Sequence, residues 1–223
     1  MNFYIVSTPI GNLKDITLRA IDTLKEVDVI LCEDTRVTAK LLNAYDIKKP
    51  MQSYHKFSKL SKIDHILDLL EDGKNLALVS DAGTPTISDP GSHLVSEIVK
   101  KFGDEAKIIP IPGASAVLAA LSVSGFFSDR FKFLGFPPHK KGRKTFFENI
   151  AEEKDVVVFY ESKHRIKKCL ESLAENIGDR QVVLCRELTK QFETIYRGTA
   201  KEVLEKLESD KALGEFVVVI DKF

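Results

Sequence analysis

Short apolar runs and amphipathic segments alternate along the first half of the chain. Brief apolar runs are typical of buried strands, whereas apolar residues spaced three or four apart indicate helices. The runs predict strands at 2–7, 28–32, 76–80 and 107–111, and the helical spacing covers 16–24, 37–44, 59–70 and 92–102. Because the strand runs are apolar on both faces and helices separate them, the pattern predicts a mainly parallel sheet covered on both sides.

The same alternation starts again after Pro112-Gly113. A helix is expected first, at 114–124, and it is nearly apolar all round, which is typical of a buried helix at a domain junction. Further strands are predicted at 132–136, 155–160, 181–186, 192–198 and 215–221, with helices at 144–152, 165–176 and 201–207. Some of these strands follow one another directly, so the second sheet is expected to be mixed. The predicted fold class is therefore α/β, with two tandem α/β domains at 1–115 and 116–223.

The composition of the chain is that of a globular protein and argues against disulfide-rich and membrane-spanning classes. The chain has 223 residues, of which 43% are hydrophobic, a fraction typical of globular proteins. Its three cysteines, Cys32, Cys169 and Cys185, have no paired spacing, which argues against a disulfide framework and favours a reducing compartment. No apolar run approaches the length of a membrane span, and the first residues lack the basic segment of a signal peptide. These features predict a cytoplasmic protein.

The densest chemical signal is the loop Ser80–Gly91, which follows a predicted strand and is rich in small residues and proline. Open α/β sheets bind ligands at the carboxyl ends of their strands. Small residues let the backbone approach a ligand closely, and free N–H groups can hold a carboxylate or phosphate. Two further loops, Thr8–Leu13 and Pro112–Ala116, end strands at the same edge. Three such loops predict a crevice lined largely by backbone, although each alone could be an ordinary turn.

Charged residues follow other strands of the two predicted sheets. Cys32–Arg36 and Glu161–Arg165 come directly after apolar runs, as do Arg186-Glu187, and Gly214-Glu215 opens the last strand. They suit either helix caps and surface ion pairs or the polar wall of an active site. The glycine fingerprints of dinucleotide-binding and P-loop proteins are missing, and Cys and His are too scattered for a zinc site.

The loop DAGTPTISDPG, Asp81–Gly91, resembles the signature of the ribosomal small subunit methyltransferase I family, which belongs to the tetrapyrrole methylase superfamily. The resemblance covers nearly the whole chain, through STPIGNL, CEDTR, PGASA, FLGFPP, YESKHRI, CRELTKQFE and GEFVVVI. It implies transfer of a methyl group from S-adenosyl-L-methionine to the ribose 2′-oxygen of a decoding-centre cytidine in 16S rRNA. It also implies that the cofactor lies in the cleft between the two domains, that the enzyme is a homodimer, and that its substrate is 16S rRNA within the 30S subunit.

The matching motifs assign candidate cofactor contacts. These are Pro9, Ile10, Asp81, Ala82, Gly83, Thr84, Ser88, Ser115 and Ala116 from the loops named above, and Tyr160 and Glu215 from the second domain. The chain departs from the superfamily at two loops, because Gly83-Thr84-Pro85 stands for Gly-Asp-Pro and Pro9-Ile10-Gly11-Asn12 stands for Gly-Pro-Gly-Asp. Backbone groups are expected to make the contacts there.

A ribose hydroxyl is a poor nucleophile, so a base or hydrogen-bond acceptor aimed at it should help. Asp34 and Glu161 are the candidates for this role, with Arg36 and Lys163 positioning phosphate or ribose. Glu33 and Asp34 suit a Mg²⁺ ion equally well, and no metal site is assigned.

A basic loop supplies the candidate RNA contacts Lys140, Lys141, Arg143 and Lys144, unless it is only a solvated surface run. The formal net charge is zero, but residues 130–168 hold 11 Lys and Arg against 5 Asp and Glu. A local patch rather than the total charge attracts an RNA backbone. Two rival functions remain at this level: a tetrapyrrole or corrinoid methyltransferase of the same fold, and a non-catalytic ribosome-binding relative.

Overall fold

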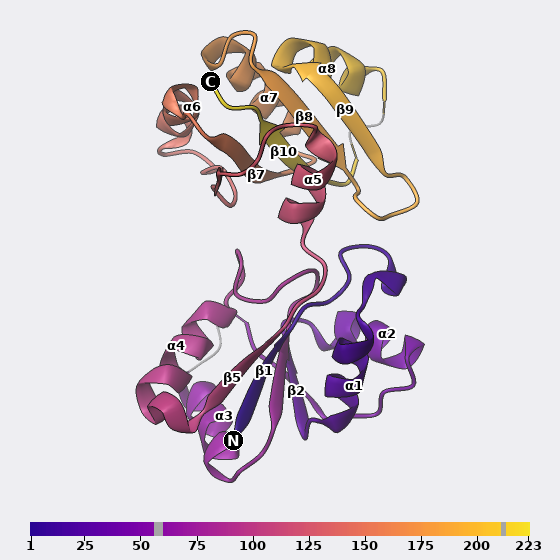
Figure 1. Cartoon of the computed structure of the whole chain (residues 1–223), viewed down its shortest axis with the longest axis vertical. Helices are drawn as coiled ribbons and strands as arrows, with labels where there is room; N and C mark the ends of the chain where they lie inside the picture. The colour runs from indigo at the N-terminus through magenta and orange to yellow at the C-terminus, as the bar shows by residue number, and fades with distance from the viewer. Residues whose placement is uncertain (56–59, 211–212) are drawn as a thin grey trace. The chain divides into compact units, whose positions relative to one another are not determined.

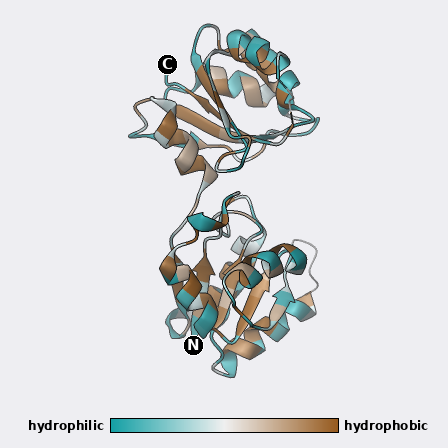
Figure 2. Cartoon of the chain, turned by 90° about the vertical axis from the view of Figure 1, so that its right-hand side faces the viewer, coloured by the Kyte–Doolittle hydropathy of each residue, from teal (hydrophilic) through white to brown (hydrophobic). Residues whose placement is uncertain are grey.

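The computed structural model describes residues 1–55, 60–210 and 213–223, and it divides the chain into two compact units, Met1–Ser115 and Ala116–Phe223 (Figure 1). Within the described residues each unit contains one five-stranded sheet. Hydrophobic residues are concentrated on the strands of both units (Figure 2). In the same described part of the chain, no helix is long and apolar enough to cross a membrane.

The sheet of the first unit is entirely parallel, with the strand order β3-β2-β4-β1-β5. Its elements in chain order are β1 (Asn2–Val6), η1 (Leu13–Asp15), α1 (Leu18–Glu26), β2 (Val29–Cys32), α2 (Thr35–Ala44), β3 (Met51–Ser53), α3 (Leu60–Glu71), β4 (Leu76–Val79), α4 (Gly91–Phe102), η2 (Gly103–Glu105) and β5 (Lys107–Ile111). The predicted parallel sheet is confirmed. The edge strand β3 was not predicted, and Lys59, the predicted start of the third helix, lies outside the described residues.

Side chains that alternate along the strands build two cores, one on each face of this sheet. Along β4, Ala77 and Val79 join the cluster beneath α1 and α2, whereas Leu76 and Leu78 join the cluster beneath α3 and α4. All four residues of β4 are buried. A strand buried on both faces reads as an unbroken apolar run, which is why the sequence pattern located it.

The second unit has a mixed sheet with the strand order β6-β7-β10-β8-β9. Strands β6 and β7 are parallel and the other neighbours are antiparallel. Its elements are α5 (Ala116–Ser124), β6 (Phe131–Phe133), α6 (Arg143–Glu152), β7 (Val156–Ser162), α7 (Ile166–Asn176), β8 (Gln181–Arg186), β9 (Thr194–Thr199), α8 (Ala200–Glu208) and β10 (Glu215–Ile220). The predicted α/β class with a mixed second sheet is confirmed.

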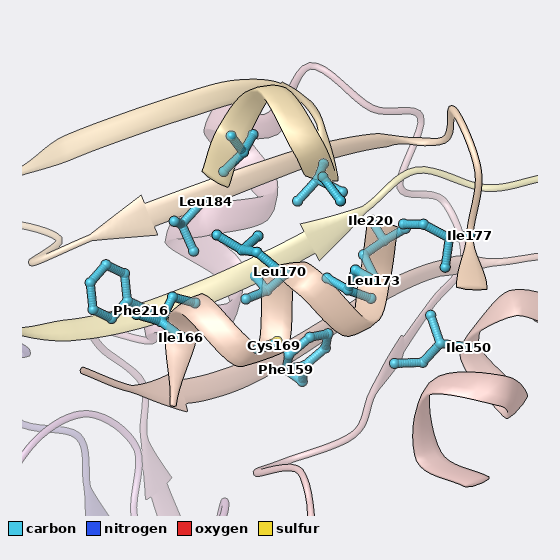
Figure 3. Close-up of a cluster of buried hydrophobic side chains, with 14 of the residues drawn as sticks. Ile150, Phe159, Ile166, Cys169, Leu170, Leu173, Ile177, Leu184, Phe216 and Ile220 are labelled. Carbon is cyan, nitrogen blue, oxygen red and sulfur yellow. The ribbon is translucent and has the colours of Figure 1, made fainter. Parts of the chain in front are cut away.

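The main core of this unit lies between one face of the sheet and helices α6, α7 and α8 (Figure 3). Phe159 of β7, Phe216 of β10 and Leu170 of α7 are buried there. Helix α5 packs against β7 and β10. Within this unit Val117, Ala120 and Leu121 of the helix are buried, whereas Leu118 is 58% exposed.

Candidate functional site

Hydrogen bonds join the three small-residue loops of the first unit. Thr8 and Gly83 exchange two backbone hydrogen bonds, of 2.9 and 3.1 Å between nitrogen and oxygen. The Thr84 hydroxyl lies 2.9 Å from the hydroxyl of Ser7 and donates to the backbone oxygen of Ala114 at 3.2 Å. The loops after β1, β4 and β5 therefore meet at one edge of the sheet, as the strand pattern predicted, because the carboxyl ends of parallel strands lie together.

The loop between β4 and α4 has a strained backbone. Gly83, Thr86 and Ser88 have φ angles of 85°, 76° and 61°. A positive φ is unusual for a β-branched threonine and costs on the order of 1–3 kcal/mol. The Asp89 carboxylate offsets this cost because it accepts hydrogen bonds from the backbone N–H groups of Thr86 and Gly91, at 3.1 and 2.6 Å. Asp89 was not among the predicted site residues, although an Asp two residues before a glycine at a helix start is a turn signal.

Two glycines permit the close approach of these loops. A Cβ atom on Gly113 would lie 2.9 Å from the Cβ of Ser7, and one on Gly83 would lie 3.4 Å from the side chain of Ile10. Asp81 and Ala82 are exposed, Ile10, Thr84 and Ser115 are half-buried, and Pro9 and Gly83 are buried. The predicted contacts of the first unit thus surround one small-residue surface, with Ser88 exposed further along the same loop.

Asp34 and Arg36 form a local ion pair at the start of α2. The Asp34 carboxylate accepts from the backbone N–H of Arg36 at 2.8 Å and lies 2.6 Å from the guanidinium of the same residue. These hydrogen bonds hold the pKa of Asp34 down to about 2. The backbone N–H of Asp34 donates to Asp81 at 3.1 Å, which joins this corner to the DAGTPTISDPG loop. Such a carboxylate is a weak base but a ready hydrogen-bond acceptor.

Glu33, next to Asp34, faces the loop and is half-buried. Burial, a hydrogen bond with Asp89 and the negative charges of Asp89 and Asp81 raise the pKa of Glu33 to about 7. Burial also raises the pKa of Asp81. No group of three or more His, Cys, Asp or Glu residues suited to a metal ion occurs in the described part of the chain, including this corner.

Glu161 does not form the exposed wall that its sequence position suggested. Strand β7 continues to Ser162 instead of ending at Tyr160, and Glu161 pairs with Phe216 of β10. Residues two apart on a strand share a face, so Glu161 points to the same side as Val157 and Phe159 of the core. Its side chain is 0% exposed and is held by two arginines. A fully covered carboxylate that two arginines already occupy cannot take a proton from a substrate, so the prediction of Glu161 as a catalytic base is corrected.

The predicted RNA contacts divide into two groups. Lys140, Lys141 and Lys144 are exposed, whereas the Arg143 side chain is only 18% exposed and forms an ion pair with Glu161. Lys144 lies 3.6 Å from Glu148 one helical turn away. Arg143 therefore points inward, which corrects its assignment as a surface contact.

The remaining candidates of the second unit lie on or beside strands β7 and β10 and at the start of helix α5. Lys163 is exposed, Ala116 is half-buried at the start of α5, and Tyr160 packs against Phe133 and Phe136 with ring centroids 5.0 and 5.2 Å apart. Glu215 is exposed and forms an ion pair with Lys190 at 2.8 Å, and Lys190 also bonds Glu187. The part played by Lys190 was not predicted.

Three comparisons with known proteins agree with this fold and these motifs. Residues 2–204 match the family model of Tetrapyrrole (Corrin/Porphyrin) Methylases. The "Ribosomal RNA small subunit methyltransferase I" of Bacillus subtilis is 48% identical over 220 residues, which cover 98% of this chain and 74% of the relative. The protein of the same name from Thermotoga maritima is 48% identical over 216 residues, which cover 97% of this chain and 96% of the relative.

Solved structures with the same fold are more distant in sequence. A diphthine synthase superposes with a TM-score of 0.73 at 15% identity, covering 99% of this chain and 89% of the other. A cobalt precorrin-4 methyltransferase has a TM-score of 0.71 at 19% identity, covering 99% and 94%. Identities this low show a shared fold and nothing about the substrate.

Proposed function

This chain belongs to the ribosomal RNA small subunit methyltransferase I family of tetrapyrrole methylases, and on that premise we propose that it methylates the ribose 2′-oxygen of a decoding-centre cytidine in 16S rRNA. Methyltransferases of this family use S-adenosyl-L-methionine as the methyl donor. The observation that carries the proposal is the 48% identity to relatives bearing this name over almost the full chain. A protein that modifies 30S subunits works in the cytoplasm, which we infer for this chain.

The joined loops of the first unit fit this cofactor. A flat adenine and a carboxylate tail require a surface without bulky side chains, and Gly83, Ala82 and Gly113 provide one. Backbone groups at Pro9, Ile10, Thr84 and Ser115 are the proposed contacts, with Asp81 and Ser88 beside them and Ala116, Tyr160 and Glu215 from the second unit. When bound, the cofactor supplies an already activated methyl group.

The residues of this chain have to bind and orient the acceptor ribose. We assign Asp34 the role of accepting a hydrogen bond from the ribose hydroxyl, because its carboxylate stays ionised and is partly exposed. Arg36, which is 87% exposed, fixes that carboxylate and can reach a phosphate. The exposed Lys163, Lys140, Lys141 and Lys144 are proposed to hold the RNA backbone. The target cytidine must leave its stack to reach the site.

Methyl transfer from labelled cofactor to three acceptors tests the substrate. The acceptors are 30S subunits, protein-free 16S rRNA and a uroporphyrinogen. We expect label in the 30S subunits, at the 2′-oxygen of a cytidine when the rRNA is digested and its nucleosides are separated. Transfer to the tetrapyrrole alone would overturn the proposal in favour of small-molecule methylation, and binding of 30S subunits without transfer would favour a non-catalytic relative. A homodimer is the proposed active species, and sedimentation of the full chain tests it.

Asp34→Asn tests the assignment of the acceptor. Asparagine keeps the helix cap but loses the ionised acceptor, so we expect the single-turnover rate on 30S subunits to fall by about 100-fold while cofactor binding is unchanged. Asp22→Asn, an exposed change on α1, is the matched control. A rate for Asp34→Asn close to that of the control would show that the role belongs to another residue.

A further inference from the structure

A buried ion cluster connects the second core to the basic loop. The two Glu161 carboxylate oxygens are both occupied: Oε2 accepts from both terminal nitrogens of Arg143, at 3.2 Å each, and Oε1 lies 2.9 Å from Arg165. Oε1 also accepts from the backbone N–H of Ser162 at 2.7 Å. These charge-assisted hydrogen bonds hold the Glu161 carboxylate in one position.

Both arginines also hold the beginning of the loop. Arg143 donates to the backbone oxygen of Pro138 at 3.3 Å, and Arg165 donates to that of Pro137 at 3.2 Å. Each guanidinium therefore bridges Glu161 and one of two successive carbonyl groups. The planar fork of arginine suits such bridging because its donors point in several fixed directions. Arg143 is further placed over the Phe147 ring, 5.1 Å from its centroid.

The loop that these arginines hold projects two lysines into solvent. Lys140 and Lys141 are exposed and form no ion pair with any described residue. Gly142 ends the loop with a φ of 83°, and Arg143 then begins α6. The cluster thus fixes the loop at both ends, at Pro137-Pro138 and at Arg143, and leaves the two lysines between them free to contact a ligand.

We propose that Glu161 is a positioning residue for RNA binding, which holds Lys140 and Lys141 in place through Arg143 and Arg165 so that they contact the phosphates of the target strand. The inference rests on the proposed function, because it assigns a purpose to a loop of that same RNA surface. Ordering the loop before binding reduces the conformational entropy lost when the lysines contact the RNA.

The direction in which Glu161→Gln changes RNA affinity distinguishes a positioning role for Glu161 from a purely electrostatic effect. Glu161→Gln removes a negative charge close to the basic loop. If charge alone governed binding, this variant would bind RNA more tightly. If Glu161 positions the lysines, the variant binds 30S subunits about tenfold more weakly, and the slope of log affinity against log salt falls by about 1.4, the value for two lost phosphate contacts. Glu152→Gln, an exposed change of the same charge on α6, is the control and should not weaken binding.

Glu161→Gln could fail to fold, so a double-mutant cycle with Arg143→Gln provides a second test that does not use this variant. Arg143→Gln leaves Glu161 paired with Arg165, so it keeps the buried carboxylate neutralised. We expect Arg143→Gln to weaken binding in the wild-type chain and to have no further effect when Lys140 and Lys141 are both alanine. Hydrogen exchange of the backbone amides of residues 139–142 should accelerate in both single variants.

Additive effects in the cycle, or binding by Glu161→Gln as tight as wild type, would overturn the inference. Wild-type chain that neither binds nor methylates 30S subunits would instead overturn the proposed function. The two failures are therefore distinguishable in one series of measurements.

Discussion

Glu33→Gln should stabilise the first unit above neutral pH and remove part of its pH dependence. The Glu33 carboxyl lies at the end of β2, hydrogen-bonded to Asp89, and its pKa is raised from 4.5 to about 7 by burial, by this bond and by neighbouring carboxylates. Protonated Glu33 donates to Asp89, whose carboxylate in turn holds the strained Thr86. Glutamine reproduces the protonated form, because its amide donates to Asp89 and its oxygen accepts from the Asp81 backbone without titrating.

The direction follows from proton uptake on folding. Between pH 4.5 and pH 7 the folded chain binds more protons at Glu33 than the unfolded chain, so the stability contributed by this group falls as pH rises through that window. At about 1.4 kcal/mol per pKa unit, the shift in the pKa of Glu33 corresponds to about 3.5 kcal/mol of unfolding free energy. Because Glu33 is only half-buried, screening by water reduces the expected effect to about 1–2 kcal/mol.

Urea unfolding at pH 4.5 and pH 8 measures the effect, with hydrogen exchange of the β1 and β4 amides reporting on the first unit. We expect Glu33→Gln to match wild type within about 0.5 kcal/mol at pH 4.5 and to exceed it by about 1–2 kcal/mol at pH 8. Glu26→Gln, an exposed change on α1, should give the same difference at both pH values. If the difference in unfolding free energy between Glu33→Gln and wild type does not increase from pH 4.5 to pH 8, Glu33 does not have the raised pKa on which the prediction depends.

Three further predictions concern packing and reactivity. Leu170→Ala should lower the free energy of unfolding of the second unit by about 2–5 kcal/mol in urea, since Leu170 is fully buried; a loss below about 1 kcal/mol would contradict its place in the core. Gly113→Ala should weaken cofactor binding measured by calorimetry and cost about 1–3 kcal/mol of stability, because its Cβ meets Ser7 at 2.9 Å; unchanged binding would show that these loops tolerate separation. The three cysteines are buried and burial raises the pKa of Cys185 to about 12, so a thiol reagent should label them only after denaturation; rapid labelling of the native chain would disprove their burial.

The parts of the fold that could be predicted from sequence are those with a local signature. Strand β4 is buried on both faces and reads as an apolar run, and the three loops meet because parallel topology brings strand ends to one edge. Strand β3 escaped prediction because Met51–Ser53 is a three-residue edge strand, half-buried and without an apolar run. Residues Met51–Ser53 form a strand because they pair with β2, and the sequence of a short segment does not reveal its pairing partner.

The errors at the candidate site have the same origin. The end of β7 is set by its ladder with β10, so the apolar run that stops at Tyr160 did not show that Glu161 continues the strand and points into the core. Arg143 looked like one more surface cation because its partner is 18 positions away. The pKa of Glu33 is raised first by burial and then by Asp89, and only the folded loop supplies both. The two errors at Glu161 and Arg143, and the unpredicted pKa of Glu33, all depend on partners distant in sequence.

The ion pairs also change the meaning of the neutral net charge. Within residues 130–168 the acids Glu148, Glu153, Asp155 and Glu161 pair with Lys144, Lys132, Arg130 and the two clustered arginines. The basic residues there that form no ion pair with a described residue are Lys140, Lys141, Lys154, Lys163, Lys167 and Lys168. If this lysine set alone contacts the RNA backbone, the slope of log affinity against log salt cannot exceed about 4 in magnitude, at about 0.7 for each contact with a single strand. A steeper slope would require contacts from paired residues such as Lys144 or the clustered arginines, or phosphate contacts from the first unit. Charge reversal of Lys140 and Lys141 would then remove less than a third of the slope.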